Sequence, residues 1–224
     1  MSSARRAFVE KRNGLLAGCK LAASIKERDP RQLALQGGVV QIHAAFEEYV
    51  EDFLSGWIFK RASSGAHVRD LPARLRAWLL HIRHEGSYRS FFLQGDEKRV
   101  LDAFDKSREP MIGFVDDSYV GRLDATDIIC SEGYPSMRNL RKIFYRLGLD
   151  DLKSFMSSRI GGNAEQLVDA FSTTRTTIAH STAGPITYRD VLAFAKRGSK
   201  IVQLLDYAFF ESLVQSPNSP IWPA

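Results

Sequence analysis

The sequence predicts an all-α protein, an up-and-down bundle of helices with extra peripheral helices, and three observations support this class. Apolar residues recur at helical spacing along most of the 224 residues. Capping residues, glycines and prolines stand where these periodic stretches begin and end. The composition, 44% hydrophobic and 25% charged, is that of an ordinary globular protein with enough apolar residues for a packed core.

The N-terminal half contains the clearest periodic stretches. A first helix is expected from Ser3 to Glu27, ended by Asp29-Pro30. Residues 39–61 form the strongest helix pattern, with a wide apolar stripe and acidic residues mainly on the other face. Residues 63–72 break the pattern, and a further helix is expected over residues 73–86.

The second half begins less clearly and ends in well-marked helices. A helix is expected from Asp96 to Lys106, whereas residues 107–136 suit a loop, a short helix or a brief extended segment. In the stretch 135–156, Gly148 is expected to cap a helix. Asn163 and Thr187 are then expected to cap the last two helices, with Asp190 as a capping-box acid.

The chain is interpreted as one domain, residues 1–224. Residues 1–30 form its N-terminal helix and residues 214–224 a frayed, proline-rich tail. Only two cysteines occur, at no zinc-like spacing, so neither a metal nor a cofactor is expected. No apolar run is long enough to span a bilayer and the N-terminus lacks the apolar centre of a signal peptide, which favours a cytoplasmic location.

The net charge of +5 permits a polyanionic partner, although the same charge also serves solubility. The unusual polar stretch is STTRTTIAHSTAG, where Arg175 and His180 are five positions apart near a helix end. Threonines compete for backbone hydrogen bonds, so a helix selected for stability alone would avoid them here. On one regular helix the two side chains would point about 140° apart. A two-fold dimer would bring them together by supplying one group from each chain.

These residues resemble the ribonuclease motif of the HEPN superfamily (higher eukaryotes and prokaryotes nucleotide-binding), in which Arg, four residues and His precede a turn and a final amphipathic helix. The stretches GGVVQIHAAFEEYVEDFL, MRNLRKIFYRLGL and ITYRDVLAFAKRGSKIVQLLD resemble its RiboL-PSP-type branch. The resemblance implies a bundle of HEPN type and a homodimeric, metal-independent endoribonuclease. Such enzymes are often toxins of toxin-antitoxin or antiviral defence systems, with RNA and an antitoxin protein as partners.

The resemblance names Arg175 and His180 as the catalytic residues. Thr176, Thr177, Ser181 and, from a neighbouring helix, Glu48 are supporting candidates. The residue after the motif arginine is commonly Asn or another strongly polar residue in active members, and here it is Thr176. Thr182 stands where a related variant has a tyrosine that an antitoxin modifies, so that mode of silencing is not expected.

The same residues suit the chemistry without reference to the family. RNA cleavage without a metal can use the adjacent 2′-hydroxyl as nucleophile, which requires a proton acceptor near neutral pH and a cation at the phosphate. Histidine and arginine supply these roles. The expected products are a 2′,3′-cyclic phosphate and a 5′-hydroxyl, formed in the presence of EDTA.

Other interpretations remain open at this stage. The bare motif also occurs at Arg76 and His81, with a near match at Arg61 and His67. Arg175 could be a solvated helix residue and His180 a cap at the helix C-terminus. The chain could then be an inactive HEPN-like module that binds nucleotide or RNA or dimerises, or an antitoxin or regulatory protein without RNA contact.

Two further features of the sequence are noted. His43 lies on an apolar face and fits a core or interface position better than a ligand. A group of basic residues suits either a phosphate track or, taken singly, solvated surface: Arg138, Arg141, Lys142 and Arg146.

Overall fold

The computed structural model describes residues 1–95, 97–98, 101–102, 123–129, 136–179 and 184–213. Within these ranges every regular element is helical, which confirms the predicted all-α class. The elements are α1 (Ser3–Ala22), α2 (Arg28–Ser63), the 3₁₀ turn η1 (Val68–Asp70), α3 (Ala73–Gln94), α6 (Ala125–Ile129), α7 (Met137–Arg146), α8 (Leu152–Ile160), α9 (Ala164–Ala179) and α10 (Tyr188–Leu213).

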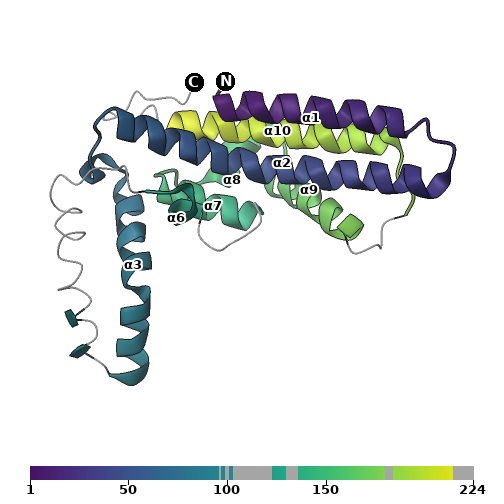
Figure 1. Cartoon of the computed structure of the whole chain (residues 1–224). Coiled ribbons are helices and arrows are strands. Elements are labelled where there is room, and N and C mark those ends of the chain that lie inside the picture. The colour runs from purple at the N-terminus through teal and green to yellow at the C-terminus, as the bar shows by residue number, and fades with distance from the viewer. Residues whose placement is uncertain (96, 99–100, 103–122, 130–135, 180–183, 214–224) are drawn as a thin grey trace.

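Three long helices, α1, α2 and α10, lie side by side and form the main body of the bundle (Figure 1). α1 runs opposite to α2 and α10, so that it begins where the other two end. The buried carboxylate of Asp206 in α10 fixes this arrangement, because it accepts a hydrogen bond from the backbone N–H of Ser2 at 3.3 Å. The Arg5 guanidinium lies 3.6 Å from the same carboxylate.

The shorter helices α6, α7, α8 and α9 lie on one side of this body, whereas α3 projects away from it (Figure 1). Stacked aromatic rings join the two layers. The Phe53 ring in α2 lies 3.8 Å from the Phe209 ring in α10, which is 4.3 Å from Phe144 in α7. In α9, Phe171 stacks on Phe194 of α10 at 4.2 Å. Aromatic burial of this kind contributes most of the packing energy of a small bundle.

Several helix ends follow the sequence prediction. The Asn163 side chain accepts the backbone N–H of Gln166 at 3.2 Å at the start of α9. Before α10, Thr187 and Asp190 form a capping box: the Asp190 N–H donates to the Thr187 hydroxyl at 3.3 Å, and the Thr187 N–H donates to the Asp190 carboxylate at 2.8 Å. Gly148 follows α7 with φ +100°, the left-handed conformation that glycine favours.

The predicted end of the first helix was wrong. α1 ends at Ala22, where the Ser24 hydroxyl donates to the Leu21 carbonyl at 2.6 Å and competes with the helical bonds. Asp29-Pro30 does not end a helix but lies in the first turn of α2. Proline is compatible with that position because the first N–H groups of a helix have no intrahelical partner.

Two other boundaries differ or lie outside the described residues. The helix predicted for residues 73–86 continues to Gln94, since Gly86 weakens a helix without ending it. Within 107–136, the described residues include the short helix α6, one of the three predicted possibilities. Most of the helix predicted from Asp96 to Lys106, and the tail 214–224, lie outside the described residues. The single-domain division stays a prediction.

Candidate functional site

Arg175 lies on α9, half-buried, and its charge acts on two side chains of α2. Burial and, to a smaller extent, the charge of the Arg175 guanidinium lower the pKa of His43 to about 4. Burial raises the pKa of the Glu47 carboxyl, whereas Arg175 opposes that rise. Arg175 therefore lies close enough to α2 for its charge to act on the Glu47 carboxyl and on the His43 imidazole.

His43 is buried in the core, on the side of α2 that the Arg175 charge reaches. Its ring is 1% exposed and stacks on Phe171 of α9 at 5.2 Å, with Phe46 edge-on at 6.3 Å. Its Nδ1 lies 3.4 Å from Oε1 of Glu47, one helical turn further along α2. Because the imidazole is buried among rings, it stays neutral near pH 7, in agreement with the prediction of a core histidine.

Of the predicted catalytic pair, the structure describes only Arg175. His180 and the supporting candidate Ser181 lie outside the described residues, as does Thr182. α9 nevertheless reaches Ala179, so the described helix ends one residue before His180.

The supporting candidates Thr176 and Thr177 are exposed on α9. Their hydroxyls donate to backbone carbonyls four residues back, to Ser172 at 3.2 Å and Thr173 at 3.0 Å. Thr174 makes the same kind of bond to Ala170 at 2.8 Å. Such bonds explain how a threonine-rich segment remains helical, because each hydroxyl is satisfied within the helix.

The structure selects a different acid from the one that the sequence favoured. Glu48 forms an ion pair with Lys11 of α1, whereas its neighbour Glu47 is the acid whose pKa Arg175 affects. From the sequence, both residues were predicted to lie on the solvent-exposed face of this helix, opposite the apolar stripe. The sequence does show that Glu47 lies four residues after His43, at the edge of the apolar stripe of α2. It does not show which helix packs along that edge.

The near match at Arg61 and His67 has a structural role. Arg61 is buried, donates to the Asp70 carbonyl at 3.3 Å and lies over the Trp57 ring at 5.7 Å. His67 forms a capping box with Asp70 at η1. In the third copy, His81 is exposed on α3 with its ring 5.5 Å from Trp78.

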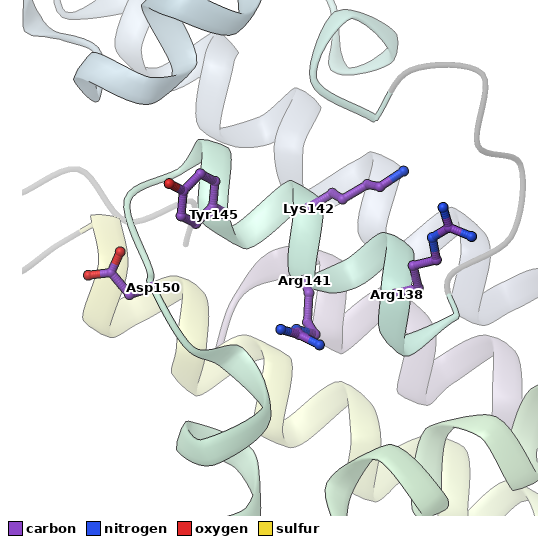
Figure 2. Close-up of a pocket in the computed structure, with 5 residues that line it drawn as sticks. All are labelled: Arg138, Arg141, Lys142, Tyr145 and Asp150. Atoms are coloured by element: carbon purple, nitrogen blue, oxygen red, sulfur yellow. The ribbon is translucent and has the colours of Figure 1, made fainter.

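The basic residues of α7 divide into two kinds. Arg146 is buried, stacks over Trp78 at 3.5 Å and donates to the carbonyls of Ile128 and Ile129 of α6. Solvated surface was therefore the wrong interpretation of Arg146, which joins α3, α6 and α7. The other three cations line a hollow of about 280 Å³ (Figure 2): Arg138, Arg141 and Lys142.

The described residues contain no group of three His, Cys, Asp or Glu side chains placed to hold a metal ion. In the same part of the chain, no helix combines the length and the apolar character that crossing a bilayer requires. Cys19, the single cysteine among the described residues, is buried and forms no disulfide there. Burial raises the pKa of its thiol.

The chain belongs to the RiboL-PSP-HEPN family, whose model matches residues 9–211. The match extends from α1 into α10 and includes the Arg175 region, so the family resemblance and the all-α fold that it implies are confirmed. No curated protein and no solved structure matches the chain.

Proposed function

We propose that this protein is a metal-independent endoribonuclease in which Arg175 and His180 act on the same phosphate of an RNA. One observation carries the proposal: the half-buried Arg175, five residues before His180, lies close enough to α2 for its charge to act on Glu47 and His43. An arginine that only kept a helix soluble would have no reason to be half-buried near a half-buried carboxyl. Membership of the RiboL-PSP-HEPN family supports the same proposal.

The proposed reaction uses the RNA itself as nucleophile. His180 takes the proton of the 2′-hydroxyl, whose oxygen attacks the adjacent phosphorus; the bond from phosphorus to the 5′-oxygen of the next nucleotide breaks, and that oxygen takes a proton from water. Arg175 stabilises the additional charge on the phosphate oxygens. Glu47 and His43 are positioning residues, since the carboxylate orients the guanidinium and the neutral imidazole supports it without competing for the anion. The products are a 2′,3′-cyclic phosphate and a 5′-hydroxyl.

A two-fold dimer completes the proposed site. On a regular helix, an offset of five positions would place two side chains about 140° apart, so each proposed site takes Arg175 from one protomer and His180 from its partner. We assign this enzyme to the cytoplasm, as a toxin-antitoxin or antiviral defence effector with an antitoxin protein as its partner. Growth arrest on expression of the wild type, and normal growth with the doubly substituted Arg175→Ala, His180→Ala protein, would support that role.

An inactive RNA-binding or dimerisation module is the second candidate, and Thr176 favours it. The hydroxyl of Thr176 bonds to the Ser172 carbonyl within α9. It therefore does not offer the free polar side chain that active members commonly have after the motif arginine.

The deciding experiment is cleavage of end-labelled RNA in EDTA by the purified protein. Arg175→Ala and His180→Ala should each lower the rate by about 10²-fold or more, because each removes one of two groups at the reacting phosphate. Arg197→Ala and His81→Ala are matched controls, since both residues are exposed and lie on helices other than α9. RNA binding without cleavage by the wild type would favour the inactive module, and cleavage that stops on chelation would refute the mechanism.

The composite site has its own test, a mixture of the two inactive variants. A heterodimer of Arg175→Ala with His180→Ala keeps one intact site of two, and random exchange makes half of all dimers heterodimers. Mixing should therefore restore roughly a quarter of the wild-type activity. If mixing restores nothing although the subunits exchange, both residues act from the same chain.

A further inference from the structure

We propose that the exposed face of α7 is a second RNA-binding surface, separate from Arg175, which holds phosphates of the same RNA strand. The sequence of α7, MRNLRKIFYR, contains four cations and no acid. Arg146 is buried and bonded to α6 carbonyls. The other three, Arg138, Arg141 and Lys142, extend from the outer face of the helix, and Arg138 and Arg141 are exposed.

Each of the acids that the structure describes near this face has a partner outside α7. Arg141 contributes only weakly to the lowered pKa of Asp151, which results first from its hydrogen bonds to Ser154. The pKa of Glu165 is lowered first by its bond to Lys153, and again Arg141 adds little. The partners are Arg74 for Asp150 at 2.5 Å, Ser154 for Asp151 at 2.6 Å, and Lys153 for Glu165.

The arrangement of the cations suits an extended chain of phosphates rather than one small anion. In Figure 2, Arg138 and Lys142 point to one side of α7 and Arg141 points to the other, so the three charges do not converge. Tyr145 lines the same hollow, 51% exposed, with the Arg74 guanidinium 4.1 Å from its ring centre. Cations spread along a surface beside an aromatic ring are typical of sites for single-stranded nucleic acid.

The position of α7 connects this surface with the proposed catalytic helix. α7 packs against α9, which carries Arg175, and both helices lie on the same side of α2 and α10 (Figure 1). A strand held along α7 would thus continue toward α9. The inference rests on the proposed function only in choosing RNA as the polyanion.

The test is the salt dependence of RNA binding, measured by fluorescence anisotropy with a short labelled single strand in EDTA. All proteins carry Arg175→Ala so that binding is measured without cleavage. Each phosphate contact with a single strand adds about 0.7 to the slope of log K against log salt, so neutralising three cations should lower the slope by about 2. Between about 50 and 200 mM salt, the parent should lose about 20-fold more affinity than the variant. Here the parent is the Arg175→Ala protein, and the variant carries three further substitutions: Arg138→Gln, Arg141→Gln and Lys142→Gln.

The matched control removes the same charge from another helix. Lys196, Arg197 and Lys200 are three exposed cations on α10, and their triple substitution by Gln should leave the slope within about 0.5 of the parent value. Equal losses in both triples would show attraction by net charge alone and overturn the proposal. If the α7 triple does not fold, the three single substitutions replace it, each lowering the slope by about 0.7.

Two other results would also overturn the assignment. One is an unchanged slope in the folded α7 variant, and the other is preferential binding to phosphatidylserine vesicles that depends on the same three residues. The outcome is independent of the cleavage assay. If the wild type does not cut RNA but binds it through α7, the proposed function fails and this inference stands; if it cuts RNA and the α7 triple binds like the parent, the reverse holds.

Discussion

The buried imidazole of His43 should make the protein less stable as the pH falls, and the size of the effect follows from its environment. His43 is 1% exposed and its pKa is lowered to about 4, from the ordinary histidine value of 6.5. Between these two values the unfolded chain binds a proton that the folded chain excludes. The free energy of unfolding therefore rises with pH in this window.

The full difference of about 2.5 pKa units corresponds to about 3 kcal/mol, which is present above pH 6.5 and lost as the pH falls toward 4. By pH 5 the loss should be about 2 kcal/mol. The raised pKa of Glu47 acts in the opposite direction, because a folded state that holds a proton more tightly gains stability at low pH.

Urea unfolding of the wild type and of His43→Leu at pH 7.5 and pH 5 isolates the histidine. The variant keeps a similar volume without a titrating group, so it should lose about 2 kcal/mol less than the wild type between the two pH values. His81→Leu serves as the control, because His81 is exposed and its variant should follow the wild type. If wild type and His43→Leu lose stability in parallel, the imidazole is not held neutral by burial and the reasoning fails.

Two further predictions compare neighbouring residues. In the RNA cleavage assay, Glu47→Gln should lower kcat by up to about 10²-fold with KM and Tm unchanged, since it misplaces Arg175. Glu48→Gln is the control and should leave kcat unchanged. If both substitutions lower kcat equally, Glu47 does not position Arg175. Gly38→Ala should cost about 1–3 kcal/mol in urea unfolding because its Cβ would overlap the Cys19 thiol, whereas Gly37→Ala, with open space at its Cβ, should stabilise α2 by about 1 kcal/mol. A neutral Gly38→Ala would show that α1 and α2 are not in close contact there.

The local features of the fold were accessible from the sequence because local interactions produce them. The caps at Asn163 and Thr187 depend on residues within three positions, and the structure contains both. The predicted end of the first helix was wrong because a local signal had two possible meanings. Proline was interpreted as a terminator at Pro30, whereas it also suits a first turn, and sequence alone does not rank the two.

The candidate site was only half accessible. Arg175 was found from its spacing to His180 in an unusually polar segment, which is a local signal. The residues that Arg175 acts on could not be predicted from the sequence, because Glu47 and Glu48 are adjacent acids on the same helix. Only the packing shows that the Arg175 charge acts on Glu47 and that Lys11 of α1 pairs with Glu48.

The residue pattern alone predicted that this protein is helical, where several of its helices begin, and which arginine and histidine are the candidates for chemistry. Helix packing, which the residue pattern does not reveal, brings the Arg175 charge near a carboxyl on α2, buries Arg146, and lets the remaining cations of α7 line one hollow. The reason is physical. Helix formation and capping are set by residues within one turn of each other, whereas the packing of helices distant in sequence decides which charges become buried.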